Sequence, residues 1–148
     1  MIGEPGNKRK SGKAENVMHL KRRILVVDDL PQHRQAAARL LSQQGFEPLE
    51  AASAAEAKNL LATERVTAVL TNMEMPGTSW LEWLQHIHRR YPRLPIILVT
   101  PFFDDEIRTT AALWGTAAVL EKPFGGLQIA TAIRMALADT AEAGLMDA

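Results

Sequence analysis

Polar side chains follow four short apolar runs of this 148-residue sequence, at the points where the runs stop. The side chains concerned are Asp28, Asp29, Asn72, Thr100 and Lys122. Adjacent carboxylates suit a hard cation such as Mg²⁺, while a hydroxyl and a lysine ammonium can bind phosphoryl oxygens. Singly, each residue is an ordinary polar residue at the end of a strand. Together, they favour a magnesium site over a helix N-cap with one solvated charge, beside a hydroxyl and a cation that suit an oxyanion.

The elements that would position these residues alternate along the chain. We expect strands at 24–27, 46–51, 66–71, 95–99 and 117–120, and helices that begin near residues 32, 54, 80, 105 and 127, the last running to about Ala138. Such alternation predicts an α/β fold, a single doubly wound five-stranded parallel sheet with five helices. In a parallel sheet the carboxyl ends of the strands share one edge, so the five polar residues should converge there.

Composition limits the function further. The formal net charge is zero, but residues 1–23 carry seven basic and two acidic side chains, which leaves an acidic remainder and argues against a specific nucleic-acid ligand. We expect a basic disordered arm over 1–22, one domain over 23–139 and a short tail over 140–148. The chain has no cysteine, which excludes disulfides and thiolate metal sites. It has no signal-like or membrane-spanning apolar run, and we therefore expect a cytoplasmic protein.

Four motifs in order resemble those of two-component response-regulator receiver domains, which are CheY-like, over about residues 23–138. They are the acidic-pair strand 24–29, the loop Asn72-Met73-Glu74-Met75-Pro76-Gly77, the strand 95–100 that ends in threonine, and Glu121-Lys122-Pro123-Phe124. The resemblance implies a flavodoxin-like sheet in the order 2-1-3-4-5. It also implies a non-enzymatic signalling module that takes a phosphoryl group from a sensor kinase, with Mg²⁺ held by the acidic pair, the acceptor and the backbone carbonyl of Glu74. Thr100 and Lys122 would bind the phosphoryl oxygens, and Val119 and Pro123 would lie at switch positions.

Asn72 departs from that family at the acceptor position, where aspartate is usual. A neutral carboxamide cannot form an acyl phosphate. It also removes one anionic ligand from the expected Mg²⁺ site. We therefore expect no phosphorylation at Asn72, no required cofactor and only weak Mg²⁺ binding. The amide can instead donate hydrogen bonds to Asp28 or Asp29.

Three neighbouring departures bear on the origin of Asn72. Trp80 replaces a usual glycine, Pro101 follows the threonine where a small residue is usual, and Val119 replaces the aromatic switch residue. Their clustering favours a natural pseudo-receiver. The alternative is an ordinary phosphoaccepting regulator of the phosphorelay type seen as an Asp-to-Asn variant.

Our leading hypothesis is a phosphorylation-independent signalling module that works through protein–protein interaction. The five strand-end residues would form a hydrogen-bonded and ionic cluster that holds one conformation. A sensor kinase, a downstream effector or a second copy would bind the face made by the fourth helix, the fifth strand and the fifth helix. A weaker alternative is a nucleic-acid or membrane adaptor that works through residues 1–23.

The remaining candidates are less specific. His86 and His88 are two residues apart on one helix, so a shared metal is not expected, and His33 has no neighbouring ligand pattern. For Phe102-Phe103, core packing and an exposed adhesive loop are equally compatible with the sequence.

Overall fold

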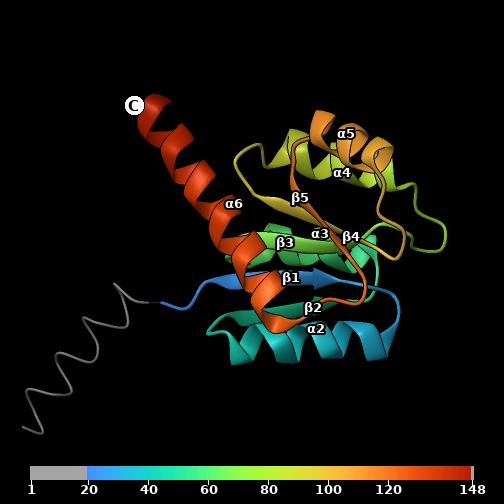
Figure 1. Ribbon diagram of the computed structural model, residues 1–148. Helices are drawn as coiled ribbons and strands as arrows, with labels where there is room; N and C mark the ends of the chain where they lie inside the picture. The colour runs from blue at the N-terminus through green and yellow to red at the C-terminus, as the bar shows by residue number, and fades with distance from the viewer. Residues whose placement is uncertain (1–19, 148) are drawn as a thin grey trace, which may run out of the picture.

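The computed structural model describes residues 20–147, with side chains up to Asp139, and shows a parallel sheet of five strands. The strands are β1 (Arg23–Val27), β2 (Glu47–Ala51), β3 (Ala68–Asn72), β4 (Ile96–Thr100) and β5 (Thr116–Glu121). The helices are α2 (Pro31–Gln43), α3 (Ala54–Thr63), α4 (Trp80–Arg90), α5 (Asp105–Leu113) and α6 (Gly126–Asp147). The spatial order β2-β1-β3-β4-β5 confirms the predicted fold (Figure 1).

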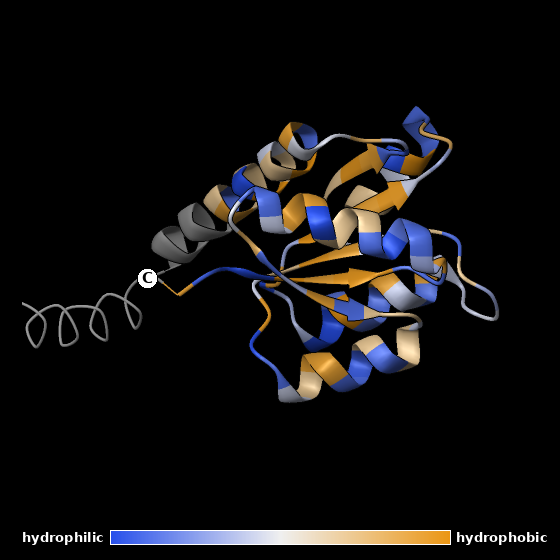
Figure 2. Ribbon diagram, turned by 90° about the horizontal axis from the view of Figure 1, so that it is seen from below, coloured by the Kyte–Doolittle hydropathy of each residue, from blue (hydrophilic) through white to orange (hydrophobic). Residues whose placement is uncertain are grey.

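Two apolar layers hold the helices to the sheet. Strand side chains alternate between faces, so Ile24 and Val26 pack with α2 and α6, while Leu25 and Val27 pack with α3 and α4. Figure 2 shows the mostly apolar strands between helices in which polar and apolar residues alternate. The central strands β3 and β4 are buried at every position, as expected of parallel strands that are covered on both faces.

Side-chain caps fix where the helices begin. Ser53 Oγ accepts from the Glu56 amide, and the Glu56 carboxylate accepts from Ala52 N at 2.7 Å, which confirms the predicted capping box apart from a one-residue displacement of the second bond. Asp104 Oδ1 caps α5 by accepting from Ile107 N. Gly115 ends that segment at φ +84°, a left-handed conformation that favours glycine.

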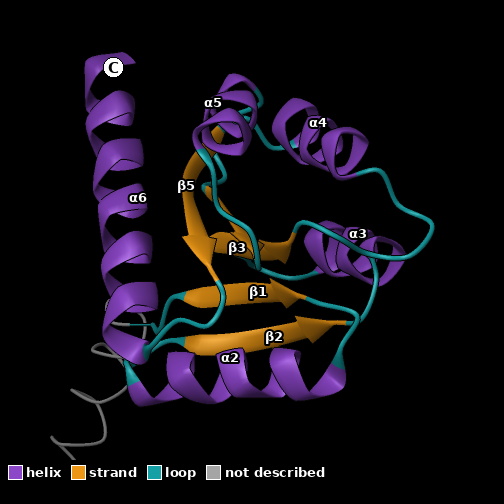
Figure 3. Cartoon of the chain, turned by 45° about the vertical axis from the view of Figure 1, so that its right-hand side comes forward, coloured by secondary structure: helices purple, strands orange, loops and turns teal. Residues whose placement is uncertain are grey.

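The predicted end of the last helix is wrong. We expected the helix to stop at Ala138, followed by a tail over 140–148, but α6 continues to Asp147 (Figure 3). Residues 138–147 hold no proline and only one glycine, so nothing local forces the backbone out of the helix. The arm predicted over 1–22 lies outside the described residues as far as residue 19.

Candidate functional site

The strand-end polar residues lie at the carboxyl edge of the sheet. Asp28 follows β1, while Asn72 and Thr100 are the last residues of β3 and β4, and all three are at least 94% buried. Lys122 follows β5 and is half-buried, with its Nζ 2.8 Å from Asp28 Oδ2. Burial of two such charges is tolerated because they neutralise each other at hydrogen-bond distance.

Asn72 uses its amide N–H groups to link two acceptors. Nδ2 donates to the backbone carbonyl of Glu74 at 2.6 Å and lies 3.5 Å from Asp29 Oδ1. The opposite rotation of the amide would place Oδ1 against the Glu74 carbonyl, two acceptors with no hydrogen between them, so the observed orientation is the favourable one. Oδ1 is buried, and it has no hydrogen-bond partner within residues 20–139.

This arrangement does not fit a magnesium ion. The groups expected to hold Mg²⁺ are the acidic pair, residue 72 and the Glu74 carbonyl, and Mg²⁺ requires oxygen ligands in octahedral array. Asn72 presents an N–H donor between Asp29 and Glu74, and both Asp28 oxygens are already occupied, Oδ1 by the Leu30 amide at 3.0 Å and Oδ2 by Lys122. In the described part of the chain, no three His, Asp or Glu side chains are grouped as metal ligands.

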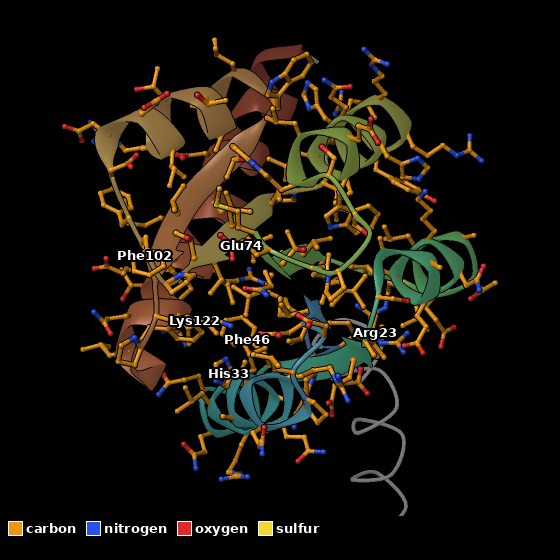
Figure 4. The ribbon with its side chains drawn as sticks, turned by 90° about the vertical axis from the view of Figure 1, so that its right-hand side faces the viewer. Arg23, His33, Phe46, Glu74, Phe102 and Lys122 are labelled. Atoms are coloured by element: carbon orange, nitrogen blue, oxygen red, sulfur yellow. The ribbon has the colours of Figure 1, made fainter. Side chains whose placement is uncertain are left out.

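Lys122 has a second partner that the sequence did not indicate. His33, in the first turn of α2, places Nδ1 3.0 Å from Lys122 Nζ, and the two side chains lie side by side below Glu74 in Figure 4. An ammonium group only donates, so Nδ1 accepts here and the ring proton is on Nε2. Lys122 is therefore held between Asp28 and His33.

The hydroxyl of Thr100 does not join this cluster as we had expected. Its Oγ1 accepts from the Phe102 amide at 3.2 Å and lies 3.4 Å from the Phe102 carbonyl. Glu121 Oε2 accepts from the Phe103 amide at 3.1 Å. These bonds fix the loop after β4, and they leave Phe102 73% exposed, so the core-packing interpretation of this residue is wrong.

A buried chain of hydrogen bonds links α4 to the backbone of Asn72. Trp83 Nε1 donates to Thr71 Oγ1 at 2.9 Å, and that hydroxyl donates to the backbone carbonyl of Asn72 at 3.2 Å. Trp83 is 98% buried against the sheet and stacks on His86 at 6.0 Å between ring centroids. Burial, followed by the positive charges of Lys58 and Arg90, lowers the pKa of His86.

An open depression of about 550 Å³ lies over Asn72. Asp29 and Glu74 supply carboxylates to its wall, and Trp80 and Pro101 supply apolar surface. The two substitutions singled out from the sequence at positions 80 and 101 therefore border the site directly.

The two predicted switch positions lie within β5 and just after its end. Val119 is half-buried and packs against the α3–α4–α5 core, while Pro123 is exposed and follows Lys122 through a cis peptide bond. Pro123 also lines a smaller groove with Leu40 and Phe124, next to His33.

Comparison with known proteins decides the family. The model of the response regulator receiver domain matches residues 24–134, which is most of the chain. The chain belongs to the receiver-domain family. It is thus a signal-transduction domain, as the four motifs predicted.

Curated relatives of this receiver are longer proteins. The chain is 31% identical to the response regulator protein PilR of Pseudomonas aeruginosa over 127 residues, covering 83% of this chain and 28% of PilR. It is 32% identical over 121 residues to the transcriptional regulatory protein FixJ of Azorhizobium caulinodans, covering 82% of this chain and 57% of FixJ. A putative NtrX-like response regulator of Rickettsia bellii is 30% identical over 115 residues, covering 76% of this chain and 24% of that protein. The receiver therefore spans between about a quarter and somewhat over half of these relatives.

Solved structures agree on the fold. A response regulator receiver domain protein from Clostridium thermocellum superposes with a TM-score of 0.74 at 28% identity, covering 81% of this chain and 97% of that one. The signal receiver domain of an HD domain-containing protein from Pseudomonas fluorescens Pf-5 gives 0.74 at 28% identity, covering 82% of this chain and 98% of that one.

Two side-chain contacts at the receiver site were not predicted from the sequence. His33 is separated from Lys122 by 89 positions, and no local pattern links them. The Trp83–Thr71 bond joins a helix to a strand, and only the apolar spacing of Trp83, which indicates core packing, was visible beforehand.

Over residues 20–147, no helix is both long and apolar enough to cross a membrane.

Proposed function

We propose that this receiver signals without being phosphorylated, as a protein-interaction module with one fixed surface. The observation that carries the proposal is the contact of Asn72 Nδ2 with Asp29 and the Glu74 carbonyl, because it puts an N–H donor where the phosphoryl reaction needs a cation. A carboxamide also lacks the nucleophilic oxygen that an acyl phosphate requires. The proposed module is not an enzyme and needs no cofactor.

The engagement of Lys122 and Thr100 supports the same conclusion. In a phosphorylated receiver these two side chains would have to reach the phosphoryl oxygens. Here Lys122 is bound to Asp28 and His33, and Thr100 is bound to the Phe102 backbone. With both groups engaged, the loop after β4 keeps one arrangement without any ligand.

The surface that we propose for partners is the predicted face of the fourth helix, the fifth strand and the fifth helix, which are labelled α5, β5 and α6. Phe102 is 73% exposed before α5, and Leu113 is 76% exposed at its end. Large apolar side chains held outward by fixed backbone are typical of binding anchors. The proposed partner is a sensor kinase, a downstream effector or a second copy of the chain, in the cytoplasm.

The direct test is an attempt to phosphorylate the protein. The chain is incubated with acetyl phosphate or phosphoramidate and Mg²⁺, and its intact mass is measured. We expect no added phosphoryl group, whereas a known active receiver treated in parallel should gain one. Acid-labile incorporation into this chain would contradict the proposal.

The competing function is an ordinary phosphoaccepting regulator in which Asn72 replaces aspartate. The variant Asn72→Asp separates the two ideas. If it gains Mg²⁺ binding and phosphorylation at the level of active receivers, then the remaining apparatus is intact and the alternative is favoured. If the chain is the proposed module, Asn72→Asp should show little phosphorylation even where Mg²⁺ binds, because Lys122 and Thr100 remain engaged elsewhere.

The weaker alternative assigns the function to the basic arm, as an adaptor to nucleic acid or membrane. Such binding would fall steeply with added salt and would vanish when residues 1–22 are deleted. Binding to a protein partner through the α5–β5–α6 face should survive both changes.

A further inference from the structure

An apolar groove lies at the amino edge of the sheet, the edge opposite Asn72. Its volume is about 550 Å³, and it is formed where α3 and α4 end and β3 and β4 begin. The apolar lining is contributed by Leu61, Val66, Tyr91, Leu94, Pro95 and Leu137. The last of these belongs to α6, so the groove reaches both layers of the fold.

The first described residues of the chain lie on the rim of this groove. The Arg23 amide donates to Thr67 Oγ1 at 3.2 Å, and the Arg23 guanidinium lies 3.5 Å from Glu64. Thr67 and Glu64 both line the groove. Two residues earlier, the Lys21 carbonyl accepts from the guanidinium of Arg65 at 3.2 Å. Lys21 and Arg23 therefore lie beside the groove.

The sequence just before this point carries an apolar cluster that the proposed function does not use. Residues 3–16 contain no Leu, Ile, Val, Met or aromatic side chain, and then Val17, Met18 and Leu20 follow within four positions. Leu20 is 58% exposed. Val17 is four residues from Lys21, so it can lie up to about 14 Å away. That distance is enough to reach into a groove whose rim the chain already touches.

We propose that Val17 and Met18 pack into this groove of their own chain, as an apolar strap across the amino edge of the sheet. Attachment through four residues gives the segment an effective concentration on the order of millimolar, so burial of two side chains is enough to favour docking. The strap would hold the basic run Lys8–Lys13 at the pole of the domain opposite the carboxylates of Asp29 and Glu74. The inference concerns a different surface from the proposed function and does not depend on it.

The test uses the full chain with isotope-labelled Leu, Val and Met methyl groups, observed by NMR. We expect nuclear Overhauser contacts from the Met18 methyl to the methyl groups of Leu94 and Leu137. The double variant V17D/M18D lacks the Met18 methyl group, so its readouts are the groove itself: the Leu94 and Leu137 signals should shift, and Tm should fall by about 3–8 °C.

The matched control is the double variant S11D/A14D, which adds the same two charges to the arm without removing an apolar group. It should keep the groove signals and the Tm of the unmodified chain. The proposal is overturned if the Met18 methyl has no contact with the groove, or if the two double variants change the groove signals equally. Contacts seen only between differently labelled copies in a mixed sample would also overturn it, since a second copy would then supply the strap.

Discussion

Replacing Asn72 by aspartate should destabilise this receiver when Mg²⁺ is absent. The change converts Nδ2, which donates to the Glu74 carbonyl at 2.6 Å, into an oxygen that can only accept. It also places a negative charge about 3.5 Å from Asp29 Oδ1. The favourable contacts on this side of the amide become repulsive.

The distances bound the size of the effect. Two unit charges 3.5 Å apart interact by about 5 kcal/mol at an effective dielectric constant of about 20. Rotation of the new side chain and partial protonation relieve much of this repulsion, because Asp29 is half-buried and not fully enclosed. The loss of the part-buried hydrogen bond to the Glu74 carbonyl costs about 0.5–1.5 kcal/mol. We therefore expect the free energy of unfolding to fall by about 2–3 kcal/mol at neutral pH.

Urea unfolding followed by tryptophan fluorescence measures this change, because Trp83 is bonded to Thr71 next to the substituted residue. The series compares Asn72, Asn72→Asp and Asn72→Ala with EDTA and then with Mg²⁺. Asn72→Ala controls for the lost amide without adding charge, and we expect Mg²⁺ to leave its stability and that of the unmodified chain unchanged. Mg²⁺ should restore part of the stability of Asn72→Asp alone.

One result would refute the reasoning. If Asn72→Asp is as stable as the unmodified chain in EDTA, then the amide does not act as the internal cross-link between Asp29 and Glu74. A Mg²⁺-dependent gain in stability of the unmodified chain would equally show that the amide leaves the metal corner open.

Three further predictions concern other parts of the molecule. Gly115→Ala should lower stability by about 1–3 kcal/mol in urea unfolding, because Gly115 has φ +84° and an added Cβ would overlap the His88 ring. Adding His88→Ala should restore only the part of the stability that is lost to this overlap, and not the part lost to the backbone conformation. The pKa of His86 is lowered, first by burial and then by the charge of Lys58, so the unfolded chain binds this proton more readily. Stability should therefore fall as pH is lowered through 6.5, and unfolding curves of His86→Gln should show a shallower dependence in that range. Phe102→Ser should change stability by less than about 0.5 kcal/mol, since the ring is 73% exposed, but should weaken partner binding about tenfold or more in a calorimetric titration.

The fold was predictable because each strand is a short apolar run with a clear stop. Local sequence was enough to predict the strand from Ile24 to Val27 and the strand that ends at Thr100. The alternation of strands with helices then indicated a parallel sheet. The end of α6 was not predictable in the same way. No breaker follows Ala138, and the small residues after it are equally compatible with a tail and with continued helix.

The candidate site was predictable in membership but not in hydrogen bonding. Parallel topology alone brings Asp28, Asn72 and Lys122 to one edge of the sheet. The hydrogen-bond partners of each side chain depend on differences of a few tenths of an ångström in the positions of loops that are far apart in sequence. That is why two hydrogen bonds appeared only in the structure, the one between Lys122 and His33 and the one between Thr100 and the Phe102 amide.

The amide of Asn72 bridges Asp29 and Glu74 with atoms of the chain itself, so the bridge is present in every folded copy. A covalent switch divides a population of molecules into two forms and can respond without new synthesis. If this receiver works as proposed, it has one form, and the occupancy of its partner follows mass action alone. The cell would then adjust this signal by how many copies it makes and how fast it degrades them.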